Sequence, residues 1–527
     1  MRWHKPLMLL ACSGTLAMAA DCGSLAKAEF SNTTISTAES LPAGSFTPPG
    51  GKPIPNLPAF CRVAGVIKPS SDSNIQFEVW MPSSGWNGKF QGVGNGGFAG
   101  AINYVGMAAA LTRSYATAST DTGHQAAGTD GRWALGHPEK LVDYGYRAVH
   151  ETAEKAKAVI RAFYGEGPRR SYFNSCSNGG RQALMEAQRF PADYDGIIAG
   201  APANGFTHLL AAAAWDMQAT LVEPSSYIPA AKLPAIQAAV QAACDAMDGV
   251  KDGVLESPAQ CRFDPAVLLC KGAESDSCLT APQVAALKNI YDGPRNSKGE
   301  RVFPGYSPGG EAEPGGWGPW ITGEEREKSL MFAFGTQFFK NMVFGDPAWD
   351  FRTFQVDRDT KAADDKAASI LNSTDPDLKR FQERGGKLIL YHGWSDAAIP
   401  ALNSPNYYQS VVSKMGENNA DAFVRLFMAP GMQHCGGGSG PNSFGQLAGG
   451  VEGDPLHDID AALERWVEQG IAPQQIIATK YKTGNDPKSG VARTRPLCPY
   501  PQVARWKGSG STDDAANFTC VTIEGSN

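Results

Sequence analysis

The strongest local indication of the fold is the sequence Ser171-Tyr-Phe-Asn-Ser-Cys-Ser177-Asn-Gly-Gly180, which continues as Arg-Gln-Ala-Leu-Met-Glu-Ala-Gln-Arg189. It predicts a short strand over 171–174, a tight turn and a helix over 181–189. A nucleophilic serine needs such a strained turn, with small residues two places before and after it. Ser175 and Gly179 hold these places around Ser177, so a serine replaces the first glycine of the usual Gly-x-Ser-x-Gly pattern. The alternative is an ordinary turn in which Ser177 only caps the helix.

Strands and helices alternate on both sides of this motif. Such alternation is typical of an α/β domain whose parallel sheet is covered by helices on both faces. The expected strands are 75–81, 88–93, 171–174, 194–199, 385–391 and 423–428, and the expected helices are 144–164, 181–189 and 458–468.

The middle of the chain departs from this rhythm. Residues 204–380 contain an Ala-rich helix, clustered cysteines and a Gly/Pro/Trp-rich stretch at 307–323. We therefore interpret 204–380 as an insertion that divides one α/β domain into two parts, 21–203 and 381–527.

An acid and a histidine follow the two later strands in the order that a serine nucleophile on such a sheet requires. Asp396 comes shortly after the strand at 385–391, and His434 comes shortly after the strand at 423–428. The chain has only 8 histidines, so one at the required place is informative. His392 is the competitor, but it lies at a strand end before the acid, where a packed structural histidine is the better interpretation. Ser177, Asp396 and His434 are therefore the predicted catalytic residues.

The first twenty residues predict export. Arg2 and Lys5 precede an apolar stretch, and small residues up to Ala20 suit a signal peptidase, so residues 1–20 have the pattern of a signal peptide. The alternative is a lipoprotein signal over 9–12 that would anchor the chain through Cys12. Either pattern predicts a secreted or periplasmic protein.

Composition excludes two classes of partner. No run of 18 apolar residues follows the first twenty positions, so no membrane span is expected. The net charge is −6 and no basic block occurs, which argues against a nucleic-acid partner.

Apart from Cys12, ten cysteines remain of the 11 in the chain. In an exported protein this even number predicts up to five disulfides, whereas ten free thiols would imply a reducing cytosol. Cys176 adjoins Ser177 and Cys435 adjoins His434, so a bond between them would fix two catalytic groups at once. The alternative is that each of the two cysteines pairs elsewhere.

The oxyanion formed by attack on a carbonyl group needs preorganised N–H donors. The backbone N–H of Asn178 is one expected donor. The other is expected from the loop Gly94-Asn95-Gly96-Gly97, with Gly97 favoured and Gly96 next. The alternative is a plain glycine turn.

A candidate metal site lies inside 204–380, in a turn that is rich in carboxylates and glycines. Carboxylate and backbone oxygens at these spacings can wrap a hard cation, although the pattern departs from that of an EF-hand. We expect a structural Ca²⁺ ion there, and the alternative is an acidic solvated turn. The predicted ligands are the side chains of Asp245, Asp248 and Asp252 with the carbonyls of Val250 and Val254.

These motifs together resemble the tannase/feruloyl esterase family, which is also similar to bacterial mono(2-hydroxyethyl) terephthalate hydrolases. The resemblance covers nearly the whole mature chain. Its carriers are Cys176-Ser177-x-Gly179-Gly180, Tyr391-His-Gly-x-Ser-Asp396, Pro430-Gly-Met-x-His434-Cys435, the acidic turn that begins at Cys244, and the stretch from Arg493 to Cys520.

The resemblance implies an α/β-hydrolase fold with a large inserted lid domain, a Ser–His–Asp triad and a calcium ion in the lid. It also implies five disulfides, namely Cys22–Cys61, Cys176–Cys435, Cys244–Cys261, Cys270–Cys278 and Cys498–Cys520.

The expected activity is hydrolysis of a small aromatic carboxylic ester, such as a feruloyl ester on a plant polysaccharide, through an acyl-enzyme on Ser177. Gallate esters and a terephthalate monoester are the alternative substrates. A peptidase, or a calcium-stabilised binding module without activity, would be a different class of protein. Aromatic residues of the insertion are candidates to hold the substrate ring, although each also suits a core position: Trp317, Trp320, Phe334, Phe338 and Phe339.

Overall fold

A nine-stranded sheet forms the centre of the computed structural model, which describes residues 20–446 and 453–522. Residues 1–19, which include Cys12 and all of the predicted signal peptide except Ala20, lie outside the described residues. The strand order is β1-β4-β5-β7-β6-β8-β9-β10-β11. The bounds are Thr33–Leu41 (β1), Phe60–Ile67 (β4), Ile75–Pro82 (β5), Lys89–Val93 (β6), Ala116–Thr120 (β7), Arg170–Cys176 (β8), Gly196–Gly200 (β9), Lys387–Gly393 (β10) and Val424–Ala429 (β11).

The sheet is mixed, which corrects the prediction of a parallel sheet. From β7 to β11 all neighbouring strands are parallel, whereas β1, β4 and β5 pair in antiparallel fashion, as do β5 and β7. No helix separates β4 from β5 along the chain. Without a crossover helix, successive strands pair as a hairpin, and this explains the antiparallel pairing of β4 with β5.

Helices cover both faces of the parallel part. Alternate residues along one strand point to opposite faces, so Phe173 of β8 packs with α3 (Ala148–Tyr164) and α4 (Asn178–Arg189), while Tyr172 packs with α14 (Ile459–Gln469). The α/β architecture expected from the sequence is therefore present. The helix expected at 144–164 begins as a π-helical turn over Asp143–Arg147 and continues as α3.

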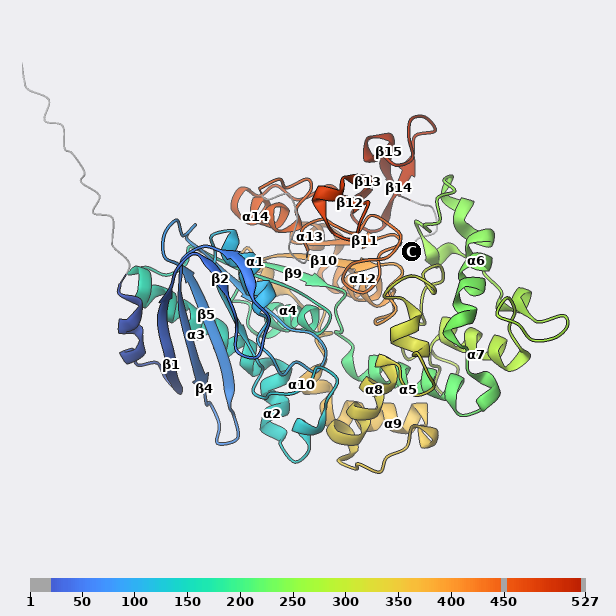
Figure 1. Cartoon of the computed structure of the whole chain (residues 1–527), viewed down its shortest axis with the longest axis horizontal. Helices are drawn as coiled ribbons and strands as arrows, with labels where there is room; N and C mark the ends of the chain where they lie inside the picture. The colour runs from blue at the N-terminus through green and yellow to red at the C-terminus, as the bar shows by residue number, and fades with distance from the viewer. Residues whose placement is uncertain (1–19, 447–452, 523–527) are drawn as a thin grey trace, which may run out of the picture.

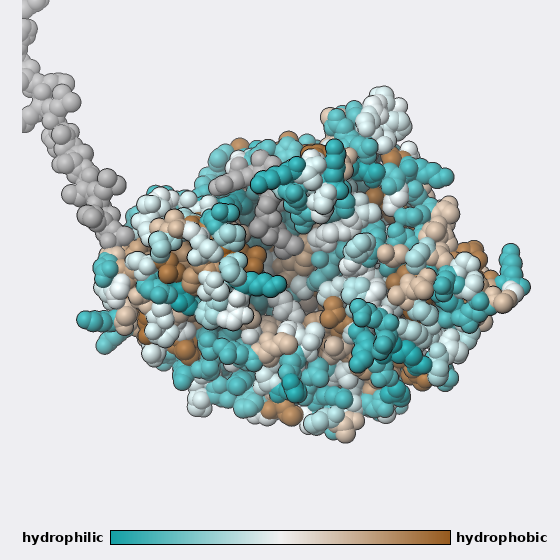
Figure 2. Space-filling model, viewed as in Figure 1, coloured by the Kyte–Doolittle hydropathy of each residue, from teal (hydrophilic) through white to brown (hydrophobic). Residues whose placement is uncertain are grey.

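The segment 204–380 connects β9 to its parallel neighbour β10 and adds no strand to the sheet. Its helices occupy the right and lower parts of Figure 1, where the colour changes from green to yellow. The same face in Figure 2 is mostly hydrophilic and is hollowed near its centre. The longer helices are α5 (Phe206–Leu221), α6 (Leu233–Cys244), α7 (Ala281–Asp292), α8 (Leu330–Gln337) and α9 (Val356–Ala363).

Two small antiparallel pairs complete the C-terminal part, at the top of Figure 1. They are β12 (Ile476–Tyr481) with β13 (Val491–Leu497), and β14 (Gln502–Trp506) with β15 (Phe518–Thr522). Among the described residues, no helix combines the length and the apolar character needed to cross a membrane.

Candidate active site

Ser177 occupies the turn between the end of β8 and the start of α4. Its backbone has φ 68° and ψ −126°, a conformation that a residue with a side chain seldom adopts. The turn is crowded, because a Cβ added to Gly179 would lie 1.9 Å from the Oγ of Ser175. Glycine is therefore required at 179, while the turn accommodates serine at 175. The turn presents Ser177 half-buried at the carboxyl edge of the sheet.

The structure brings Asp396 and His434 to this edge. Because β8, β10 and β11 run parallel, the loops that follow them meet at their carboxyl ends. His434 Nε2 lies 2.9 Å from Ser177 Oγ, and His434 Nδ1 lies 2.8 Å from Asp396 Oδ2. These distances are those of a nucleophile, a base and an orienting acid.

Asp396 is 2% exposed and is held by several donors. Its Oδ1 accepts hydrogen bonds from the backbone N–H groups of Ala398 at 2.7 Å and Ile399 at 2.8 Å. Burial acts to raise the pKa of Asp396, but attraction to His434 and hydrogen bonds with His392 and His434 outweigh burial and lower it. The carboxylate therefore stays ionised and can stabilise an imidazolium at His434.

His392 belongs to the site indirectly. It is fully buried, as expected for a packed histidine, but its Nε2 lies 3.2 Å from Asp396 Oδ2. Its Nδ1 lies 2.7 Å from the Oγ of Ser404, which fixes the ring orientation. The sequence interpretation missed this contact with the acid, although the i,i+4 spacing of His392 and Asp396 was a usable signal.

The two predicted oxyanion donors lie beside Ser177. Gly97, Asn178, Ser177 and His434 all line one cavity. Neither the Gly97 nor the Asn178 backbone N–H donates a hydrogen bond within the described chain. Gly97 has φ +57°, and a Cβ there would lie 2.4 Å from the carbonyl oxygen of Gly128. Gly96, the second choice, is exposed and does not line the cavity.

The cavity measures about 60 Å³ and is lined mainly by apolar side chains. Of the predicted aromatic residues, Trp320 and Phe334 line it. The Trp320 ring lies 5.1 Å from the His434 ring and 6.3 Å from the Phe334 ring, measured between centroids. Trp317, Phe338 and Phe339 are instead at most 1% exposed and pack in the core of the inserted segment.

A disulfide joins Cys176 to Cys435, whose Cα atoms lie 6.0 Å apart. It links the residue before Ser177 to the residue after His434. The other four pairs implied by the resemblance are also formed: Cys22–Cys61, Cys244–Cys261, Cys270–Cys278 and Cys498–Cys520.

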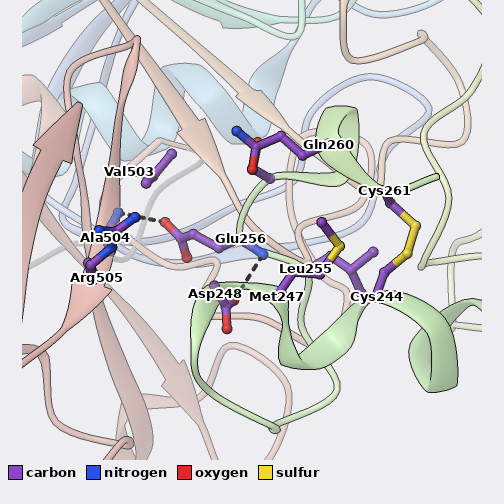
Figure 3. A pocket seen from close by; sticks show the side chains of 11 residues that line it. Cys244, Met247, Asp248, Leu255, Glu256, Gln260, Cys261, Val503, Ala504 and Arg505 are labelled. Atoms are coloured by element: carbon purple, nitrogen blue, oxygen red, sulfur yellow. Dashed lines mark hydrogen bonds between the residues drawn. A yellow bond between two sulfur atoms is a disulfide. The ribbon is translucent and has the colours of Figure 1, made fainter. Parts of the chain in front are cut away.

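The predicted calcium loop folds over β14 (Figure 3). Asp245 accepts hydrogen bonds from the Gly253 N–H, and Asp248 accepts them from the N–H groups of Val250 and Glu256. Burial raises the pKa of Asp248, and burial raises the pKa of Glu256 to about 8. Carboxylate oxygens that lie close together are the kind of ligand that a hard cation such as Ca²⁺ prefers.

Two features of this loop differ from a preformed ion cage. Asp252 pairs with Arg493 at 2.8 Å and with Arg495 at 2.7 Å. The carboxylate oxygens of Asp245, Asp248 and Asp252 do not all lie within 4.8 Å of one another. Calcium at this loop therefore stays a prediction.

One group of His, Asp and Glu side chains in the described chain does converge within 4.8 Å, namely His150, Glu186 and Asp193. It lies at the far end of α4 from Ser177. There the ammonium of Lys157 contacts the carboxylate of Asp193, so a cation is already present, and we assign no metal.

Comparisons with known proteins identify the family of the chain. A family model described as tannase and feruloyl esterase matches residues 61–521. An uncharacterized esterase of Xanthomonas campestris pv. campestris is 47% identical over 531 residues, covering 96% of this chain and 92% of the relative.

Two solved structures are similar over most of the chain. Feruloyl esterase B from Aspergillus oryzae has a TM-score of 0.87 and 31% identity, with 95% of this chain and 99% of that chain covered. A tannin acyl hydrolase from Aspergillus niger has a TM-score of 0.74 and 25% identity, with coverages of 94% and 93%. With an α/β-hydrolase-like fold and relatives of this kind, the chain belongs to the tannase and feruloyl esterase family and is a carboxylic ester hydrolase.

Proposed function

We propose that the protein cleaves esters of aromatic acids through a covalent intermediate on Ser177. His434 Nε2 removes the hydroxyl proton of Ser177 as its Oγ bonds to the ester carbonyl carbon. Asp396 orients the imidazole and stabilises the imidazolium. The N–H groups of Gly97 and Asn178 receive the negative oxygen, and water then hydrolyses the acyl-enzyme. The observation that carries this proposal is the 2.9 Å distance between Ser177 Oγ and His434 Nε2. The other ring nitrogen of His434, Nδ1, lies 2.8 Å from Asp396 Oδ2.

For the substrate, we favour a hydroxycinnamic ester of the feruloyl type, including one attached to a plant polysaccharide. The ring planes of Trp320 and Phe334 are within 11° of parallel, and these residues line the cavity together with apolar side chains. Flat aromatic groups pack well against such rings. The similarity to a feruloyl esterase B supports this choice, and the similarity to a tannin acyl hydrolase supports gallate esters as the alternative. A terephthalate monoester is the third candidate.

Rates with methyl ferulate, methyl gallate and the terephthalate monoester will rank these substrates. Replacing Trp320 with alanine should change the ratio of kcat/KM between feruloyl and galloyl esters by about tenfold, because an apolar wall discriminates modestly between similar groups. Hydrolysis of p-nitrophenyl acetate, whose acyl group carries no aromatic ring, should change little.

The matched control is Phe344→Ala, because Phe344 is an exposed aromatic residue of the same inserted segment that does not line the cavity. It should leave the ratio unchanged. A Trp320→Ala variant that slows all esters by one factor, including the acetate, would show that Trp320 only packs and does not select the substrate.

We further propose that the loop at 245–254 binds a structural Ca²⁺ ion. In support, three carboxylates lie within eight residues, and partial burial raises the pKa of Asp248. The loop lies next to β14 rather than at the catalytic serine, so the ion would join the inserted segment to the C-terminal part.

Adding a chelator should therefore lower the melting temperature of the wild-type protein, on the order of 5 °C, because an ion bound only to the folded state stabilises it by mass action. The Asp248→Asn, Asp252→Asn double variant should melt lower and respond little to the chelator. The exposed Asp276 of the same segment provides the control substitution, Asp276→Asn. Native mass spectrometry of the full-length protein without a bound divalent ion would exclude the calcium proposal.

We also propose that the protein acts outside the cytoplasm. The five disulfides are consistent with an oxidising compartment, and the pattern of residues 1–20 is that of an export signal. Lipid attachment at Cys12 is the alternative to release. The N-terminal sequence of the mature protein distinguishes the two.

A further inference from the structure

Arg181 carries a buried positive charge one turn beyond Ser177 on α4. Its side chain is 0% exposed, and its guanidinium donates to three backbone carbonyl oxygens, those of Tyr144, Gly145 and Leu371. In the described chain it has no ion pair with a carboxylate. Burial lowers the pKa of Arg181, but an arginine stays protonated in proteins. A buried cation without a counter-charge is costly, and so its retention here requires an explanation.

The same guanidinium is connected to one of the predicted oxyanion donors. Arg181 Nε donates to Asn178 Oδ1 at 2.8 Å. The hydroxyl of Tyr144 lies 3.0 Å from Asn178 Oδ1 and 3.0 Å from the carbonyl oxygen of Gly97. One small network therefore contacts both loops that supply N–H groups to the cavity.

Arg181 also lies directly behind the cavity wall. Its guanidinium carbon is 5.5 Å from the ring centroid of Phe206, and Phe206 and Asn178 both line the cavity. The ring of Tyr144 covers the guanidinium at 4.8 Å. Arg181 thus cannot touch a substrate, but its charge acts across a single layer of side chains in a region that excludes water.

We propose that Arg181 is the counter-charge of the oxyanion, acting through Asn178 as a positioning residue. The inference rests on the proposed mechanism, in which Ser177 Oγ bonds to the carbonyl carbon and its proton passes to His434 Nε2. The π electrons of the carbonyl group then move onto its oxygen, which becomes negative. Before attack, Arg181 has no anionic partner among the residues that the structure describes. Its attraction is therefore stronger in the transition state than in the ground state, which is the condition for accelerating the reaction.

The test compares Arg181→Lys, Arg181→Gln and Arg181→Met in the full-length protein. Removing the charge should lower kcat on the order of 100-fold with little change in KM, as loss of an oxyanion contact does. Arg181→Lys keeps the charge and should lose less activity than Arg181→Gln. Phenylboronic acid, which forms a tetrahedral anion on a catalytic serine, should bind more weakly by the same factor as kcat falls.

Arg425 provides the matched control, because it is a buried arginine that has a carboxylate partner, Asp421, at 2.6 Å. Arg425→Met should lower the melting temperature without lowering kcat. Equal losses in Arg181→Lys and Arg181→Gln, or unchanged boronate affinity, would overturn the proposal. If Arg181→Met does not fold, the comparison of Arg181→Lys with Arg181→Gln still tests the proposal.

Labelling with diethyl p-nitrophenyl phosphate separates this proposal from the mechanism on which it rests. Phosphorylation of Ser177 in the wild-type protein supports the mechanism, and labelling elsewhere contradicts it. A wild-type protein labelled at Ser177, together with a fully active Arg181→Met variant, would overturn the role of Arg181 alone.

Discussion

Replacing Ser177 with alanine should abolish ester hydrolysis while the protein still folds. No other group in the cavity can form the acyl-enzyme, so kcat should fall by about 10⁴-fold to 10⁶-fold, as it does when a triad member is removed. Alanine also carries a Cβ, so the unusual backbone at φ 68° is no worse for the variant than for the wild type. Steady-state rates with methyl ferulate, together with thermal melting, test both parts of the prediction.

Ser410→Ala is a suitable control, since Ser410 is a half-exposed serine of α12 (Asn403–Met415) and lies outside the cavity. It should keep the wild-type rate. A Ser177→Ala variant that retains more than about a hundredth of the wild-type turnover would show that another nucleophile operates.

Asp396→Asn should be almost as damaging, for a reason visible in the hydrogen bonds. Asp396 Oδ1 accepts from two backbone N–H groups, so the carbonyl oxygen of an asparagine would be held at that place. The NH₂ group would then face His434 Nδ1 and force the imidazole into the tautomer that carries its proton on Nε2. That tautomer cannot accept the proton of Ser177, and we expect kcat to fall by about 10⁴-fold with a small change in KM.

The matched control for this prediction is Asp454→Asn. Asp454 forms a pair with His457 at 2.7 Å, but both side chains are more than one-third exposed and neither lines the cavity. Its loss should leave kcat unchanged. If Asp396→Asn keeps most of its activity while its melting temperature falls, Asp396 only supports the loop and does not orient His434.

Local chemistry near strand ends could be predicted from the sequence. Ser177 follows its strand directly, and Asp396 and His434 come shortly after theirs. Because parallel strands end at one edge of the sheet, the place where these residues meet follows from their order. The disulfide between Cys176 and Cys435 was predictable for the same reason, because both cysteines adjoin these residues.

Contacts that depend on packing across distant segments could not be predicted. Trp320 lines the cavity, whereas Trp317, three residues earlier, is buried in the core. The Gly/Pro-rich stretch around them has no helical or strand period from which a facing direction could be derived. The role of Arg181 depends on carbonyl groups of residues 144, 145 and 371, whose proximity only the folded chain shows. The antiparallel edge was missed because only β5 of its three strands was expected from the sequence, and an apolar pattern does not show the direction of a strand.

The Cys176–Cys435 disulfide has a consequence for how the enzyme matures. It joins residues 259 positions apart, so the chain between them must be made and delivered before the bond can form. During synthesis and export the N-terminus comes first, so Ser177 is present long before His434. Oxidation of this pair thus requires that the turn of Ser177 and the loop of His434 have both been made, and a product truncated before His434 would lack both the crosslink and the histidine. Hosts that fold the protein in a reducing cytoplasm should yield chains without this bond, and thiol mapping would distinguish them from finished enzyme.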